Sequence, residues 1–295
     1  DEYGLSLILG LILKETPFFL LASMAAIEQF PANKIFKIGK SLQHSNLSTW
    51  LLLIFPNLYK RIRLVIFIVI AFTSSVIDMA VLLAPSTPST LSIRILQIYQ
   101  SVDLDSIFIA SSLALVQIFI ITILISCWFI IEKIINQKFF FLFIIKILPR
   151  EKSLLEKYLF ISGVCLISLS IVGIVNAIFW GLGDEWYFPN IFPDTYTFDH
   201  LTNFLYENKF IMFISLFIAL IVSLISIIII IVWLEICDYL SFQNRYLESL
   251  IFIPLFIPQI SFLIGVQTFL IKIDFTNYLI ALIAIEILYV IPYCF

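Results

Sequence analysis

The chain has 295 residues, of which 62% are hydrophobic and 13% are charged, and its mean hydropathy is +1.10. This composition excludes an ordinary soluble domain and is typical of a protein embedded in a membrane. The formal net charge of −3 gives no general attraction to nucleic acid, so we expect no nucleic-acid partner.

Seven apolar runs are predicted to cross the bilayer, because each supplies about 20 apolar residues. In chain order they are Leu5–Ile27, Leu64–Ala84, Ile107–Ile131, Leu154–Leu182, Lys209–Leu234, Ser249–Ile271 and Asn277–Phe295. The predicted fold class is therefore all-α, a polytopic membrane helical bundle of about seven transmembrane helices.

The charges of the loops predict which side of the membrane each loop faces. Lys34–Arg63 and Lys133–Lys157 carry six Lys or Arg each, which marks them as cytoplasmic. The loop Gly183–Asn208 is acidic and lacks Lys and Arg, so we expect it outside. Trp180, Trp186 and Tyr187 fit the aromatic belt at the membrane interface. A short helix over Thr90–Gln100, after Pro88, is predicted in the outer loop Pro85–Asp105.

Charged residues interrupt two of the runs. Lys14-Glu15-Thr16-Pro17 lies inside the first, where Pro17 should kink the helix. Either Lys14 and Glu15 are tucked against neighbouring helices or Lys14 reaches the interface, or these residues line a pathway. Asp78 lies near the outer end of the second run and either bonds to Ser74 or Ser75 or lines the same pathway.

The basic loop Lys34–Arg63 is predicted to engage a soluble partner. It contains no acidic residue, and Lys34–Gln43 and Leu47–Tyr59 each have the pattern of a short helix. A helical hairpin joined directly to two spans can transmit a push from outside the lipid. The alternative is a basic loop that only fixes topology.

In the second basic loop, Lys133–Lys157, the apolar stretch before Pro149 is too short to cross the membrane and is expected to lie at the interface.

Nothing in the sequence predicts catalysis, a metal or a cofactor. His44 and His200 are isolated, and the cysteines are far apart and read as buried single thiols: Cys127, Cys165, Cys237 and Cys294. Gly39-Lys40-Ser41 ends like a phosphate-binding loop, but position 34 is Lys where that motif needs Gly. We therefore expect that this chain is not an enzyme and does not bind ATP.

The basic loop resembles the EAA loop of binding-protein-dependent ABC importer permeases, the MetI-like family. Aligned on Pro56, the Glu of the EAA pattern falls on Lys37 and its Gly on Gln43, and Ile38 and Gly39 fill the two Ala positions. Gly39-Lys40-Ser41-Leu42, Trp50 and Ile54-Phe55-Pro56 follow the pattern. The flanking stretches KETPFFLL, SSVIDMAVLLAPSTPSTLSIRI, IPQISFLIGVQ and LYVIPYCF resemble the double-length fused permeases.

The resemblance implies a truncated MetI-like permease fold with three parts. These are the end of a first permease unit (1–132), a cytoplasmic linker or interfacial helix (133–153) and the start of a second unit (154–295). Pro17 and Pro292 would be equivalent positions of the two units. The chain begins at Asp1 and ends inside an apolar run, so we expect a fragment of a longer protein.

The resemblance also implies a plasma-membrane importer, multi-pass in a bacterial inner membrane. Its partners would be the lipid bilayer, a cytoplasmic ABC ATPase dimer and an extracytoplasmic substrate-binding protein. The coupling residues would be Lys37, Gly39, Lys40, Ser41, Leu42, Gln43 and Pro56. The substrate path would be lined by Glu15, Pro17, Asp78 and Glu286. Relatives of the fused type suggest ferric iron or thiamine, and the wider family includes oxyanion and polyamine importers.

Two other classes remain as alternatives. An ion-coupled secondary transporter would use Glu15, Asp78 or Glu286 as ion carriers. A membrane enzyme would need a polar catalytic cluster, which the sequence does not offer.

Overall fold

The structure is a computed structural model that describes residues 4–42, 49–85, 87–101, 103, 105–135, 154–240, 250–275 and 277–294. Within these ranges the chain is helical, and the one strand-like pairing is an isolated bridge between Gly183 and Tyr196. Four helices are long and apolar enough to cross a membrane: α1 (Leu5–Glu28), α7 (Ser106–Ile135), α9 (Leu154–Gly181) and α11 (Lys209–Tyr239). The protein is therefore a multi-pass helical membrane protein, as its composition predicts.

The helices form two compact units. The first unit comprises Asp1–Ile161 and Leu255–Asp274, and the second comprises Ser162–Pro254 and Phe275–Phe295. Besides α1 and α7, the first unit holds α2 (Ala32–Ser41), the π-helix η1 (Trp50–Ile54), α4 (Phe55–Ser75), α5 (Asp78–Leu83), α6 (Leu91–Tyr99) and α14 (Gln259–Lys272). The second holds most of α9, then α10 (Asp199–Glu207), α11 and α15 (Tyr278–Cys294), and α13 (Ile253–Phe256) lies across the boundary.

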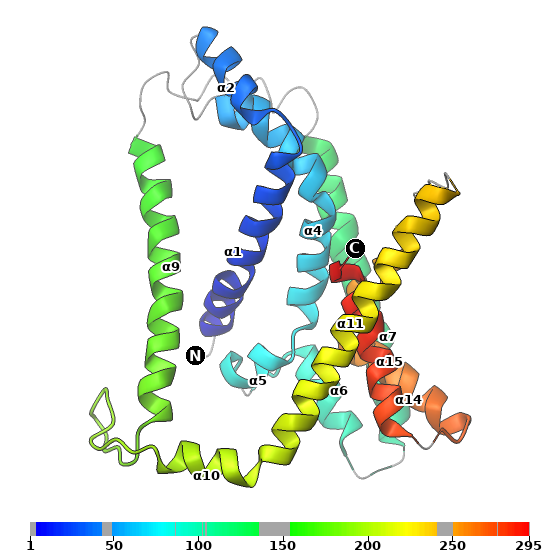
Figure 1. Ribbon diagram of the computed structural model, residues 1–295. Helices are drawn as coiled ribbons and strands as arrows, with labels where there is room; N and C mark the ends of the chain where they lie inside the picture. Colours follow the sequence, from blue (N-terminus) through cyan, green and yellow to red (C-terminus); the bar gives the residue numbers. More distant parts are fainter. Residues whose placement is uncertain are drawn as a thin grey trace. The chain divides into compact units, whose positions relative to one another are not determined.

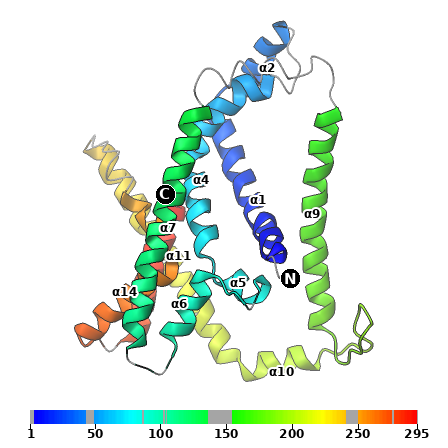
Figure 2. The same cartoon turned by 180° about the vertical axis from the view of Figure 1, so that it is seen from behind.

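The core of the first unit consists of three apolar clusters, each of which joins neighbouring helices. Ala26 of α1 packs with Leu58 and Ile62 of α4 at one end, and α1 and α4 lie side by side in Figure 1. A second cluster joins Val76, Ala80 and Ile93. The third joins α6, α7 and α14 through Ile95, Ala110, Ile260 and Ile264, at the end of α7 that is nearest α6 in Figure 2.

The second unit is held together by α11 and α15, which pack along each other. The buried residues of α11 are Val222, Ser226 and Ile230, spaced four apart, so they share one face of the helix. Most other side chains of α11 remain exposed in this unit, as expected of a helix surrounded by lipid.

Two predicted spans are broken in the structure. The helix expected over residues 64–84 ends at Ser75, Val76 is extended, and α5 begins at Asp78. The helix expected over residues 249–271 is interrupted before Pro258, which precedes the first turn of α14. A proline disfavours the helical conformation of the residue before it, which explains the second break.

The basic loop also differs from its prediction in one respect. The helix Ala32–Ser41 confirms the first predicted hairpin helix, but the second is not a separate element. It begins as η1 and runs on without interruption into α4, the first part of the next span. Pro56 stands in the first turn of α4, directly after the π-helix η1. It has no N–H to donate to a carbonyl of η1, so the junction of the two segments lacks one backbone hydrogen bond. The interfacial helix expected before Pro149 lies outside the described residues.

Candidate functional site

The first part of the candidate site is an ion pair between α1 and α5. Lys14 Nζ donates a hydrogen bond of 2.9 Å to Asp78 Oδ2. The same ammonium lies 4.7 Å from the centroid of the Phe72 ring, within the range of a cation–π interaction. Three helical segments, α1, α4 and α5, therefore meet at one cation.

This ion pair lies at mid-membrane depth if α1 spans the bilayer. Lys14 is the tenth residue of α1, about 15 Å from its start at 1.5 Å per residue. The apolar part of α4, Leu64–Ser75, covers about 18 Å, well short of the roughly 30 Å of a hydrocarbon core. On these lengths Asp78 would lie nearer the middle of the bilayer than the outer end of its span, where the sequence predicts it.

At this depth, the break between α4 and α5 restricts what can surround the ion pair. Non-helical backbone at membrane depth is tolerated only where it is buried in protein or lines a wet cavity. Asp78 lies in the first turn of α5, where the positive end of the helix dipole favours a carboxylate. Lys14 and Asp78 both remain partly exposed in the first unit, with side chains 40% and 66% accessible. Because lipid would not solvate them, protein or water must cover this face.

The structure decides between the predicted partners of these charges. Asp78 pairs with Lys14, whereas the hydroxyls of Ser74 and Ser75 bond back to Ile70 and Ala71 carbonyls one turn earlier. Local bonding of Asp78 to these serines is therefore wrong. Lys14 is thus bonded to a residue of another helix, as the prediction that it packs against its neighbours requires.

Of the other predicted path residues, Glu15 interacts electrostatically with both members of the pair. Glu15 follows Lys14 on α1 and is half-buried, and Pro17 is exposed while α1 continues through it. Glu286 is an exposed residue of α15 in the second unit. Within the first unit, the structure thus brings together Lys14, Glu15 and Asp78.

The second part of the site is the hairpin of α2 and η1, at the other end of α1. Lys37, Lys40, Ser41 and Leu42 are all exposed, and Gly39 is buried. Pro56 is half-buried at the start of α4. Gln43 lies outside the described residues. The helix therefore presents its lysines to water and its glycine to the rest of the hairpin.

Gly39 is the point at which α2 contacts η1. A Cβ added to Gly39 would stand 2.3 Å from Thr49 Cγ2 and Oγ1, and 2.8 Å from Thr49 Cβ. Thr49 is itself 1% exposed, and its hydroxyl finds no hydrogen-bond partner among the described residues. The β-branched side chain has little freedom to move away, so only glycine allows this approach.

The base of the hairpin is fixed to three helices by polar and aromatic contacts. Arg61 Nη1 donates to Gln29 Oε1 (2.6 Å) at the end of α1. Arg63 Nε donates to Glu132 Oε2 (2.9 Å), and Trp128 Nε1 donates to Tyr59 Oη (3.0 Å), both joining α4 to the end of α7. These contacts put the end of α1, the start of α4 and the end of α7 on one side of the membrane, as the loop charges predict.

Sequence reasoning missed two of these features. Glu132 was not recognised as the partner of Arg63, although an acidic residue one turn after Trp128 at the end of a span was a usable signal. Gln117 of α7, 1% exposed, donates to Ser92 Oγ of α6 (2.6 Å) and so ties the predicted outer helix to a span. A lone amide inside an apolar run was the available signal.

Among the residues that the structure describes, no cluster of three or more potential metal ligands is present. Comparison of the chain with protein-family models, with curated proteins and with solved structures found no match.

Proposed function

We propose that this chain is the permease subunit of an ATP-driven ABC importer, with a MetI-like fold, and that α2 is the element its cytoplasmic ATPase grips. The observation that carries the proposal is that α2 is coupled to the membrane through close packing on η1 and the continuous helix of η1 and α4. Gly39 locks α2 onto η1, η1 runs into α4 without a break, and α4 ends at the interruption beside Asp78. A displacement of the exposed lysine face of α2 is therefore passed along one helix to the intramembrane ion pair.

In this mechanism the ATPase supplies the energy and the chain supplies the path. Closure of an ATPase dimer would shift α2, and α4 would tilt as a lever about its contacts with α1 and α7. The Lys14–Asp78 pair lies where the lever ends, so tilting would open or close the wet face that these charges require. A substrate-binding protein outside the membrane would deliver the substrate.

The test is a photocrosslink from α2. A photoreactive amino acid replaces Leu42, which is exposed at the end of α2, and membranes are labelled with an azido analogue of ATP. The expected product joins this chain to a nucleotide-labelled subunit, and the double substitution Lys37→Glu/Lys40→Glu should reduce it at least several-fold. The same amino acid at Leu205, on the predicted outer side, is the control. A nucleotide-labelled adduct from both positions, or from neither, contradicts the proposal.

An ion-coupled secondary transporter is the second candidate, and the broken helix beside the Lys14–Asp78 pair favours it. Broken helices form the ion and substrate sites of many secondary transporters. Proteoliposomes that contain only this chain distinguish the two. A secondary transporter should carry a proton current above that of empty vesicles when a membrane potential is imposed, and Asp78→Asn should abolish it. A permease that depends on an ATPase should carry none.

A further inference from the structure

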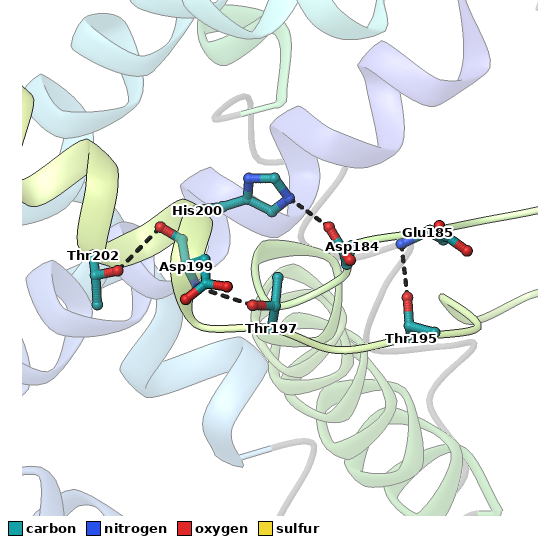
Figure 3. A network of polar contacts seen from close by, with 7 residues as sticks. All are labelled: Asp184, Glu185, Thr195, Thr197, Asp199, His200 and Thr202. Atoms are coloured by element: carbon teal, nitrogen blue, oxygen red, sulfur yellow. Dashed lines mark hydrogen bonds and ion pairs between the residues drawn. The ribbon is translucent and has the colours of Figure 1, made fainter.

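The segment between α9 and α11 is a folded element with its own hydrogen bonds. Asp184 N–H donates to the Thr195 carbonyl (3.0 Å), and Asp194 N–H donates to the Glu185 carbonyl (2.8 Å), which closes residues 182–197 into a hairpin-like loop. Glu185 N–H also donates to Thr195 Oγ1 (3.1 Å) (Figure 3). We refer to residues 182–198 as the aromatic loop.

Polar groups of this loop form hydrogen bonds that tie it to α10. His200 Nε2 lies 3.0 Å from Asp184 Oδ1, so the first turn of α10 is bonded to the start of the loop (Figure 3). Thr197 Oγ1 accepts the Asp199 N–H, and Thr202 Oγ1 donates to the Asp199 carbonyl. The loop and α10 therefore form one body.

Large apolar side chains of the aromatic loop are left exposed. Phe188 is 85% exposed and Ile191 79%, and Tyr187 and Phe198 are also exposed. Asp194 holds this arrangement in place, because its carboxylate accepts hydrogen bonds from the Tyr187 N–H (3.0 Å) and from Asn190 Nδ2 (2.6 Å). Exposed aromatic side chains on an ordered loop indicate a surface that contacts a membrane or an apolar partner.

The helix α10 carries a second apolar surface. Leu201, Phe204 and Leu205 are spaced three and four apart on one face, and all are exposed. Asp199, Asn203 and Glu207 are spaced four apart on the opposite face. Nine residues with one apolar and one acidic face match a helix that lies along a boundary between oil and water.

The way α10 is joined to the neighbouring helices locates this boundary. Glu207 is separated from the first residue of α11 by Asn208 alone, and hydrogen bonds continue through the corner, from Asn208 N–H to the Phe204 carbonyl and from Met212 N–H to the Asn208 carbonyl. Figure 1 shows α10 leading directly into α11. The other end of the body continues from Gly181, the last residue of α9. Both ends of the body are thus attached to apolar spans, at the level where the lipid headgroups begin.

We propose that the aromatic loop and α10 lie in the membrane surface, with Phe188, Ile191 and the Leu201/Phe204/Leu205 face inserted between lipid headgroups. The acidic face of α10 would remain in water. Because residues 183–208 contain five carboxylates and no Lys or Arg, the fitting lipid is zwitterionic and not anionic. This inference does not depend on an ATPase, so it can fail or stand independently of the proposed function.

The test is site-directed spin labelling of the full chain in phosphatidylcholine nanodiscs. The four cysteines, none of which lies in this body, are first replaced by alanine. Phe204→Cys is compared with Asn203→Cys, the adjacent residue on the acidic face, and Leu201→Cys is compared with Glu207→Cys. Since all four positions are exposed, labelling should leave the fold intact, and a single symmetric elution peak checks this.

The readout is collision of each label with oxygen, which enters lipid, and with a water-soluble nickel chelate. Labels at Phe204 and Leu201 should collide several-fold more with oxygen than with the chelate, and those at Asn203 and Glu207 should show the reverse. Equal access of the chelate to all four labels would overturn the proposal in favour of a water-facing surface. Exclusion of both reagents at Phe204 would overturn it in favour of a protein partner or a second copy of the chain.

Discussion

Gly39 is the residue on which the stiffness of the hairpin depends. Its missing side chain allows the backbone of α2 to rest on Thr49, and no polar bond between the two described residues holds the contact. Among the described residues, close packing at Gly39 therefore keeps α2 against η1, and a single added methyl group should open it.

We predict that Gly39→Ala weakens the α2–η1 contact by about 1–3 kcal/mol, the usual cost of overpacking. Hydrogen exchange of the α2 amides should then be accelerated by roughly 5- to 100-fold, which mass spectrometry measures. Gly39→Ala/Thr49→Gly removes every clashing atom and should restore slow exchange. Gly265→Ala is the control, because a Cβ there meets nothing within 4 Å. Unchanged exchange in Gly39→Ala would show that the contact is not tight.

At the scale of the element, α4 is the helix that joins the two parts of the site. Its first turns carry Tyr59, Arg61 and Arg63, which bind the ends of α1 and α7, and its last residue precedes the break. Two polar contacts tie α5, beyond the break, to α1: the ion pair with Lys14, and the hydrogen bond that Ser6 Oγ donates to the Leu83 carbonyl (2.8 Å). The pair therefore limits how far the segment after the break can move.

We predict that Lys14→Met destabilises the protein more than the double substitution Lys14→Met/Asp78→Leu. The single change leaves a carboxylate without its cation at membrane depth, at a cost of about 2.5–3.5 kcal/mol on insertion scales. The double change removes both charges, and replacing an ion pair by apolar groups is often neutral. The thermal unfolding midpoint in detergent reports the difference. An equal loss in both proteins would mean that water already solvates Asp78 fully.

The elements show what a sequence can and cannot predict about this fold. The four long spans and the helices near residues 32–41 and 91–99 follow from apolar length, periodicity and helix-start signals, and the structure contains them. The break at Val76 was not predicted, because VID carries no Gly or Pro and the run is apolar over the length of a span. The weak helix formers Thr73, Ser74 and Ser75 just before it were the available signal. The contact that holds Asp78 beyond the break is tertiary, because Lys14 lies on a helix 64 positions earlier in the chain.

The candidate site was predicted unevenly for the same reason. Exposure of Lys37 and Lys40 follows from the amphipathic pattern of α2, and Lys14 and Asp78 stand out as charges in apolar runs. Their pairing, and the partnership of Gly39 with Thr49, depend on contacts between separate helices. The residue pattern along one helix does not show which residues of another helix it will contact.

At the scale of the whole molecule, Pro17 and Pro292 occupy different surroundings. Pro17 is exposed in the middle of α1 of the first unit, whereas Pro292 is buried near the end of α15 of the second. The predicted equivalence of the two prolines therefore does not extend to their packing. The sidedness of the first unit bears directly on the proposed function, because an ATPase partner could reach α2 only from the cytoplasm.

We predict that Leu42 is cytoplasmic and Ser101 is on the opposite side. Leu42 follows α2, next to the clustered ends of α1, α4 and α7, whereas Ser101 lies between α6 and the start of α7, 30 residues of helix away. In a chain with its cysteines replaced by alanine, a membrane-impermeant maleimide should label Ser101→Cys in intact cells. It should label Leu42→Cys only after the membrane is opened. Both side chains are exposed, so burial does not limit either reaction. Labelling of Leu42→Cys in intact cells would place the lysine face of α2 outside, where no ATP-driven subunit could grip it.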